Sequence, residues 1–411
     1  MTDLSRKGWP RVAARAQAVA ALGVVAMVAA LTLSGCGGGA SGAGGVTVED
    51  TSLAGFQWVL PSSMPAPRVP DTNPMSAAKV ELGHHLFYDQ RLSGNGTQAC
   101  SGCHQQDKAF TDGRARAVGS TGEGHPRNAQ GLANVAYHPT LTWANPGLTT
   151  LEQQMAVPLF GTNPVEMGVN DSNKAAVLQR LIDAPLYQRL FAQAYPGEAQ
   201  PISWPHVVQA IAAFQRTLLS FNSKYDRVQR GQALYTEAEA RGAQLFFGEQ
   251  AECFHCHGSA NFNDQLVHAG TRVVETPFHN TGLYNTDGQG GFPFPNRGVF
   301  ELTGNAWQMG MFRAPSLRNV EKTAPYMHDG TIATLEAVLD FYAAGGRHVT
   351  GQEADAFLAQ YPGDGRLNPH KDSLITRISL SDQDKADLVA FLKTLTDDDF
   401  LHNPLQADPF Q

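Results

Sequence analysis

Cys100-Ser101-Gly102-Cys103-His104 and Cys253-Phe254-His255-Cys256-His257 are two CxxCH motifs in this chain of 411 residues. The motif is typical of covalent c-type haem attachment, in which both thiols form thioether bonds and the following His lies beneath the iron. Zinc sites and redox CxxC pairs use the same cysteine spacing but do not require that His. Its presence in both motifs predicts two covalent haems, held by Cys100, Cys103, His104, Cys253, Cys256 and His257.

The fifth cysteine, Cys36, ends a stretch with the layout of an export signal. Four basic residues precede an uncharged run from Ala16 to Leu33, as in a bacterial n-region and h-region. The sequence LSGC (33–36) resembles a lipobox, in which the Cys becomes the lipidated first residue. The alternative is an uncleaved anchor, because about 18 apolar residues can just span a bilayer. Both alternatives predict a protein on the periplasmic face of a bacterial membrane, without deciding which membrane.

Charge and composition divide the chain further. Residues 1–35 carry a net charge of +3 and the whole chain −8, so the remainder is near −11. This balance argues against a nucleic-acid partner. A Gly- and Ser-rich stretch after Cys36 predicts a flexible tether. The expected segments are a lipoprotein signal peptide (1–35), a tether (36–64), an N-terminal haem domain (65–225) and a C-terminal haem domain (226–411).

A weak internal repeat supports two similar halves. Residues 76–88, with LGHHLF (82–87), precede the first CxxCH, and residues 236–248, with GAQLFF (242–247), precede the second; both have apolar residues at helical spacing. Each half closes with another helical stretch, 204–221 or 381–395, and Ser381 is a good N-cap before an acidic first turn. The pattern predicts an all-α fold of two c-type cytochrome domains with long loops and one covalent haem each.

Four blocks around these motifs resemble the bacterial di-haem cytochrome c peroxidase and MauG family. They are LFYDQRLS (86–93), NPVEMG (163–168), FRAPSLRN (312–319) and TAPYMHDG (323–330). The chain looks most similar to the MauG-like enzymes associated with methanobactin operons, through Phe254-His255, LFG (159–161) and YMHDG (326–330). The likeness covers residues from about 65 to 400.

For the first haem, the resemblance implies a peroxide site. Splitting the O–O bond needs an open iron position and a group that moves a proton between the two oxygens. The family places that group at Glu166, with Gln154 as a polar neighbour and Pro158 shaping the pocket. Many members also carry a loop His that blocks this iron. Ser120 aligns with that position here, although His125 lies close, so we expect an open iron.

For the second haem, the resemblance implies a sixth ligand in the segment VLDFYAAGG (338–346). Cytochrome c peroxidases use a Met, whereas MauG-like enzymes place an axial Tyr here, which would be Tyr342. A thioether favours ferrous iron, and a hard phenolate favours ferric or higher states. The rival ligands are Met309, Met311 and Met327. The hypothesis is Tyr ligation.

Two further assignments depend on the family alone. Trp143 corresponds to the residue that carries charge between the haems, although an isolated Trp is normally a packing residue. Asn128, Thr323 and the carbonyl of Pro325 match an inter-haem calcium site, and such hard oxygen ligands suit Ca²⁺. His328 could line a pocket, and His255 is a decoy beside the expected ligand His257.

The predicted function is that of a di-haem peroxidase-type oxidoreductase. In the MauG-like form it uses H₂O₂ to reach a high-valent di-haem state and oxidises a periplasmic partner protein, such as a small copper-binding protein. One alternative is a cytochrome c peroxidase that takes electrons from a small cytochrome or cupredoxin. A non-enzymatic electron carrier or sensor is the other, and it would have no use for Glu166.

Overall fold

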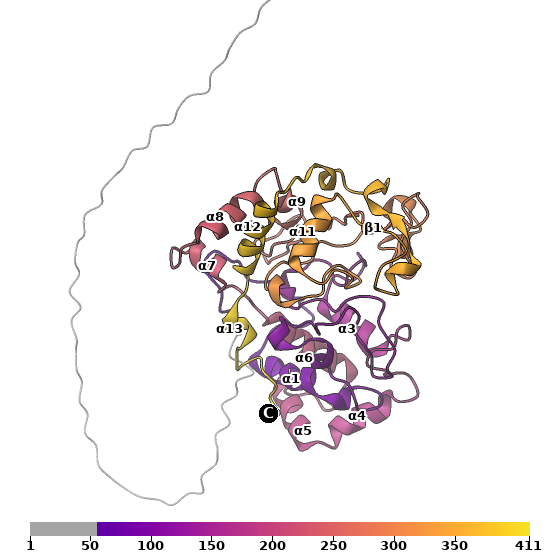
Figure 1. Cartoon of the computed structure of the whole chain (residues 1–411). Helices are drawn as coiled ribbons and strands as arrows, with labels where there is room; N and C mark the ends of the chain where they lie inside the picture. The colour runs from indigo at the N-terminus through magenta and orange to yellow at the C-terminus, as the bar shows by residue number, and fades with distance from the viewer. Residues whose placement is uncertain (1–55) are drawn as a thin grey trace, which may run out of the picture. The chain divides into compact units, whose positions relative to one another are not determined.

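The computed structural model describes residues 56–411, and regular structure in this range is mostly helical (Figure 1). The export signal, Cys36 and most of the tether lie outside the described residues. The α-helices are α1 (Ala77–Tyr88), α2 (Cys100–Cys103), α3 (Leu151–Phe160), α4 (Lys174–Ile182), α5 (Pro185–Ala194), α6 (Trp204–Arg216), α7 (Lys224–Gln229), α8 (Glu237–Phe246), α9 (Cys253–His257), α10 (Phe300–Thr303), α11 (Leu335–Ala343), α12 (Asp382–Lys393) and α13 (Asp398–Leu401). The strands are β1 (His348–Val349) and β2 (Gly363–Asp364), which pair antiparallel.

Short 3₁₀ turns connect these elements within long loops. They span Gln90–Leu92, Gln106–Lys108, Val135–Tyr137, Ala306–Gln308, Val320–Lys322, Leu358–Gln360, Gly365–Leu367 and Ser373–Arg377. The mainly helical class is confirmed, and the predicted helical stretches before each CxxCH and at the end of each half are α1, α8, α6 and α12.

The internal repeat is visible as two equivalent helix crossings. In the first half α1 packs on α6 at Gly83, where an added Cβ would lie only 1.9 Å from the carbonyl oxygen of Ala210. In the second half α8 packs on α12 at Gly242, where an added Cβ would lie 2.0 Å from the carbonyl oxygen of Asp387. The two glycines occupy corresponding places in LGHHLF and GAQLFF. Each allows two backbones to approach closely beside its CxxCH motif.

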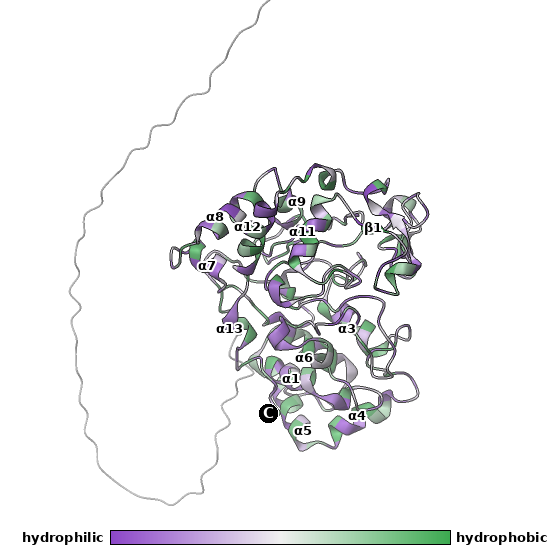
Figure 2. Cartoon of the chain, in the orientation of Figure 1, coloured by the Kyte–Doolittle hydropathy of each residue, from purple (hydrophilic) through white to green (hydrophobic). Residues whose placement is uncertain are grey.

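Local sequence determines where the helices begin. Ser381 accepts a hydrogen bond from the backbone N–H of Asp384, whose carboxylate accepts from the Ser381 N–H, so α12 starts with a capping box as predicted. Thr236 and Glu239 form the same arrangement at α8. Hydrophobic and hydrophilic residues alternate along these helices (Figure 2), as expected when one face of each is buried.

The two halves are joined by more than the linker between α6 and α7. The last residues of the chain return to the first half, where Phe400 and Leu401 of α13 join its hydrophobic core. His84 and Tyr88 of α1 hydrogen-bond the carbonyl oxygens of Ala407 and Gln406 at 2.6 Å. Residues from 398 onward therefore pack with the N-terminal half, although the sequence assigns them to the C-terminal one. Among residues 56–411, no helix has the length and apolar character needed to cross a bilayer.

Candidate haem sites and peroxide site

The first cavity is built around the first CxxCH motif. It contains about 1860 Å³ of space free of protein atoms, part of it open to solvent. Its lining includes most of the side chains predicted for the peroxide site, together with a histidine that was not assigned to it: Cys100, Cys103, His104, His125, Trp143, Gln154, Pro158 and Glu166. Helices α2 and α3 and the loop of residues 163–168 bring these side chains together.

The second cavity surrounds the second CxxCH motif and is similar in size, about 1840 Å³. Cys253, Cys256 and His257 of α9 line it, together with Tyr342 of α11. All three rival methionines pack against the hydrophobic cluster that contains Trp143, but of the three only Met327 lines this cavity. Two candidate sixth ligands, Tyr342 and Met327, therefore line the second cavity.

Both motif histidines are oriented as haem ligands should be. His104 Nδ1 lies 2.7 Å from the carbonyl oxygen of Phe110, and His257 Nδ1 lies 2.8 Å from that of Phe262. A carbonyl can only accept, so Nδ1 carries the proton in each ring and Nε2 keeps its lone pair. Metal-bound histidines usually show this second hydrogen bond. His255, the other histidine of the second motif, instead faces Glu252: its Nε2 lies 2.9 Å from Glu252 Oε2.

Other groups in the cavities also fit covalent haem. The four motif cysteines are free thiols, and burial raises the pKa of both Cys100 and Cys253 to about 12. Arg313 lines the second cavity and is almost fully buried; burial lowers its pKa to about 10. Its Nη2 donates to Gln130 Oε1 at 2.6 Å, but Nε and Nη1 find no partner among residues 56–411. A buried guanidinium needs an anionic partner, and a haem propionate would supply one.

Glu166 has the properties of a proton-transfer group. Its side chain is about 28% exposed, and burial raises its pKa from 4.5 to about 7. The nearest titratable side chain is His125, whose Nε2 lies 3.9 Å from Glu166 Oε1. Gln154 lines the same cavity, with no direct hydrogen bond to Glu166 within the described part of the chain. A carboxyl group with a pKa near neutrality can both accept and donate a proton.

Tyr342 has a free hydroxyl in the second cavity. Burial raises its pKa above the ordinary range, and no hydrogen-bond partner for its hydroxyl occurs in residues 56–411. The phenol is therefore neutral until a cation replaces its proton. An unpartnered phenol in a haem-sized cavity fits an axial ligand.

Trp143 lies in the wall that the two cavities share. It lines both, as do Asn128, Gln130 and His138. The indole is 9% exposed, and its Nε1 donates to the carbonyl oxygen of Asn128 at 2.9 Å. The predicted position of Trp143 between the two haem sites agrees with this geometry.

Comparison with known proteins identifies the family. Residues 77–234 match the sequence profile described as di-haem cytochrome c peroxidase. The methylamine utilization protein MauG of Methylorubrum extorquens is 32% identical over 369 residues, covering 89% of this chain and 91% of MauG. The cytochrome-c peroxidase IdrP1 of Denitromonas iodatirespirans is 34% identical, covering 81% of this chain and 85% of IdrP1. The chain belongs to the di-haem cytochrome c peroxidase and MauG family.

A solved structure gives a nearer relative within this family. It is the crystal structure of a MauG-like protein associated with microbial copper homeostasis, with 54% identity and a TM-score of 0.84. The alignment covers 87% of this chain and 100% of that one. These relatives confirm that the chain is an enzyme, a peroxidase-like di-haem oxidoreductase with c-type haems.

The loop that carries Ser120 and His125 differs in detail from what the sequence led us to expect. Ser120, which aligns with the blocking His of other members, does not contribute to the lining of the first cavity; its backbone N–H donates to the carbonyl oxygen of Glu166 at 2.7 Å. The histidine of this loop that lines the cavity is His125, five residues later. The sequence noted its proximity but could not show its direction, because the loop that carries it has no periodic pattern.

The residues that the resemblance assigns to calcium contribute to the second cavity. Asn128, Thr323 and Pro325 all line it. Asn128 Nδ2 donates to the carbonyl oxygen of Arg114 at 2.7 Å, which orients the amide and leaves Oδ1 available as a hard oxygen ligand. His328 is also here, buried and stacked on Phe312 with ring centroids 3.7 Å apart, and burial lowers its pKa to about 4.

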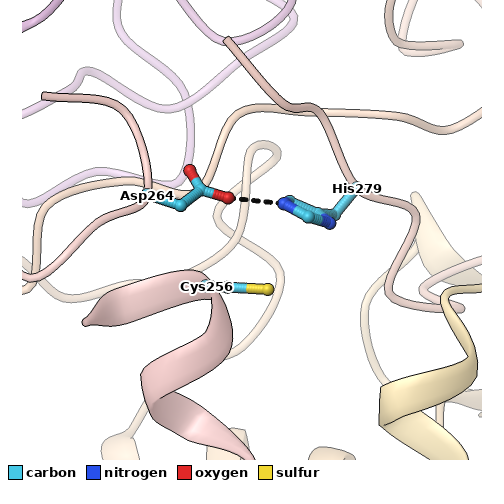
Figure 3. Close-up of side chains that lie close together, drawn as sticks. All are labelled: Cys256, Asp264 and His279. Carbon is cyan, nitrogen blue, oxygen red and sulfur yellow. Dashed lines mark hydrogen bonds and ion pairs between the residues drawn. The ribbon is translucent and has the colours of Figure 1, made fainter. Parts of the chain in front are cut away.

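A third cluster, Cys256, Asp264 and His279, has side chains close enough to suggest a metal site (Figure 3). Burial lowers the pKa of His279, but hydrogen bonds to Asp264 at 2.6 Å and Asp372 at 3.0 Å outweigh it and raise the pKa to about 12. The imidazolium already occupies both carboxylates, and Cys256 is needed for haem attachment. His279, Asp264 and Asp372 therefore form an ion triad at the edge of the second haem site.

Proposed function

We propose that this chain uses H₂O₂ to oxidise side chains of a partner protein, as a MauG-like enzyme. The observation that carries this proposal is the difference between the two cavities. A proton-transfer group, Glu166, serves the first, whereas a neutral phenol, Tyr342, faces the second. An electron carrier or an enzyme with two similar haems would not need this asymmetry.

Glu166 moves a proton in the first cavity. When bound, the two haems would supply the two electrons that peroxide reduction consumes. His104 would hold the first haem through Nε2, and Glu166 would take a proton from one peroxide oxygen and return it to the other. The open iron position expected from Ser120 belongs to this proposal.

Tyr342 closes the second site. His257 and Tyr342 would both hold the second haem, and a phenolate from Tyr342 would favour ferric or higher states, whereas the thioether of Met327 would favour ferrous iron. Ligation by Tyr342 suits storage of an oxidising equivalent. Ligation by Met327 suits a peroxidase that receives electrons from a donor protein. Trp143, in the shared wall, would let charge pass between the sites.

The proposed partner is suggested by the MauG-like protein of 54% identity. Because that protein is described as associated with microbial copper homeostasis, we propose a small copper-binding periplasmic protein as the substrate. The competing function is a peroxidase with a small cytochrome or cupredoxin as electron donor, which the relative IdrP1 represents.

One experiment separates the two functions. The protein is mixed with H₂O₂ and, in parallel, with a reduced small cytochrome or with a small copper-binding protein encoded beside this chain. We expect mass spectrometry to show oxygen added to one residue of the copper-binding protein, while the cytochrome stays reduced. Rapid oxidation of the cytochrome with an unchanged copper-binding protein would assign the donor-dependent peroxidase instead.

Three further proposals concern the setting of the enzyme. Ca²⁺ would bind Asn128, Thr323 and the carbonyl oxygen of Pro325. Residues 65–225 and 226–411 would each hold one haem. Lipidation of Cys36 would fix the protein to the periplasmic face of a membrane, and Cys36→Ser should then release it into the soluble periplasmic fraction.

A further inference from the structure

His125 stands opposite Glu166 in the first cavity. Both side chains line it, and 3.9 Å separates His125 Nε2 from Glu166 Oε1. This distance is slightly beyond a hydrogen bond, and such contacts often tighten when substrate binds. Their exposed fractions are also similar, 26% for His125 and 28% for Glu166.

The backbone holds the two residues in this relation. Ser120 N–H donates to the carbonyl oxygen of Glu166 at 2.7 Å, and a Cβ on Gly119 would lie 1.9 Å from the carbonyl oxygen of Val165. Val118 and Gly124 pair across the loop, and His125 N–H donates to the carbonyl oxygen of Ala117 at 2.7 Å. The loop that carries His125 is thus fastened to the segment that carries Glu166.

Nδ1 of His125, the ring nitrogen away from Glu166, has a hydrogen-bond partner whether or not it carries a proton. Nδ1 lies 3.0 Å from the backbone N–H of Arg127 and 3.1 Å from its carbonyl oxygen. If Nδ1 is bare, it accepts from the Arg127 N–H, and Nε2 carries the proton. If Nδ1 is protonated, it donates to the carbonyl, and Nε2 is free to accept. His125 can therefore present a donor or an acceptor to Glu166.

We infer that His125 is the acid–base partner of Glu166, exchanging with it the proton that peroxide cleavage requires. The inference rests on the proposed function and extends it to a second residue. His125 acts through Glu166: with Nδ1 protonated and donating to the Arg127 carbonyl, the bare Nε2 takes the proton of the Glu166 carboxyl, and the imidazolium so formed returns that proton from Nε2 to the carboxylate.

The step balances. One oxygen of H₂O₂ gives its proton to Glu166, the O–O bond breaks with its electron pair going to the other oxygen, and the proton returns to that oxygen, which leaves as water. The remaining oxygen atom takes up the two electrons that the peroxidase reaction draws from the haems. The Glu166–His125 pair ends with the proton count it began with.

Few other charges face the pair. Arg127 is next to His125, but its Nη2 pairs with Glu301 Oε2 at 3.1 Å, so it is already compensated. Burial lowers the pKa of His125, with a smaller contribution from Arg127. The titratable groups around the pair are Cys100, Cys103, Glu123, Arg127 and Glu301, and haem attachment makes both cysteines neutral thioethers.

Two variants that replace His125 with an amide side chain, tested in the holoenzyme, separate the contact with Glu166 from proton exchange with Glu166. His125→Gln places an amide near the position of Nε2 and keeps a polar group facing Glu166, but it cannot take up a proton. His125→Asn places the amide near Nδ1 and loses the contact. The readouts are the infrared C=O band of the protonated Glu166 carboxyl, assigned by its loss in Glu166→Gln, and the rate of the peroxide reaction.

We expect His125→Asn to shift the carboxyl band to higher wavenumber and His125→Gln to leave it in place. Both variants should slow the peroxide reaction at least about tenfold, within the range for loss of one acid–base group. His206→Gln, a histidine stacked on Tyr195 outside both cavities, should change neither readout.

Three results would overturn the inference. They are an unmoved band in His125→Asn, a wild-type rate in His125→Gln, or a resting iron that becomes high-spin only when His125 is replaced, which would make His125 an iron ligand. If instead Glu166→Gln reacts with peroxide as fast as the wild type, the proposed role of Glu166 fails. The two failures are therefore distinguishable.

Discussion

Replacement of Glu166 by Gln should make the protein more stable while it slows the enzyme. Burial raises the pKa of this carboxyl from 4.5 to about 7, so the ionised form is disfavoured in the folded state. A difference of about 2.5 pH units corresponds to about 3 kcal/mol. Because the side chain is about 28% exposed, solvent screens part of this, and we expect about 2 kcal/mol.

The sign of the pH dependence follows from linkage. The folded protein holds the Glu166 proton more tightly than the unfolded chain does, so its stability is highest below pH 4.5 and falls as the pH rises through 7. Glutamine has no such proton. The stability gain of Glu166→Gln should be near zero below pH 4.5, should grow between pH 4.5 and 7, and should be constant above that range.

Urea unfolding of both proteins at pH values from 4 to 8 measures this directly, and the covalent haems stay attached throughout. Glu198→Gln, which replaces an exposed carboxyl, serves as the control and should show no comparable trend. A stability difference that does not vary with pH would refute the assignment of a buried, neutralised carboxyl. The peroxide reaction of Glu166→Gln should be slower by about 10²- to 10⁴-fold.

Three other predictions test the packing and the metal proposal. Gly242→Ala should lose about 1–3 kcal/mol of unfolding free energy, because its Cβ would lie 2.0 Å from the Asp387 carbonyl oxygen, whereas Gly270→Ala meets only ordinary contacts and should be nearly neutral. Asp226→Asn should cost about 3–5 kcal/mol, since it leaves Arg318 buried without its carboxylate, which now lies 2.8 Å away. Burial raises the pKa of Asp226, but Arg318 outweighs it and lowers the net value, so this loss should shrink as the pH falls through the carboxyl range. Removal of Ca²⁺ with a chelator should lower the thermal midpoint of the wild type but not that of Asn128→Ala; equal changes in both would exclude Asn128 as a ligand.

Much of the fold could be predicted because its signals are local. Apolar spacing and N-caps identified α1, α6, α8 and α12, and both motif histidines line a cavity with Nδ1 hydrogen-bonded to a backbone carbonyl. The return of α13 to the first half could not be foreseen, because it depends on contacts between Phe400 and residues about 300 positions earlier.

The candidate site shows the same division. Glu166, Gln154, Trp143 and Tyr342 line the cavities to which the family resemblance assigned them. His125 and Arg313 were missed as site residues, although both lie in or near quoted motifs. Their importance comes from loops folding against each other and from unpaired buried atoms, and neither leaves a periodic pattern in the sequence.

The inequality of the two haem sites is tested most directly by electron paramagnetic resonance of the resting ferric protein. Under the proposed function we expect one high-spin signal from the His104 site and one low-spin signal from the His257 site. Tyr342→Phe should remove the low-spin signal, while Met327→Leu should leave both signals unchanged. Two low-spin signals in the wild type, or a low-spin signal that survives Tyr342→Phe and disappears in Met327→Leu, would contradict the account.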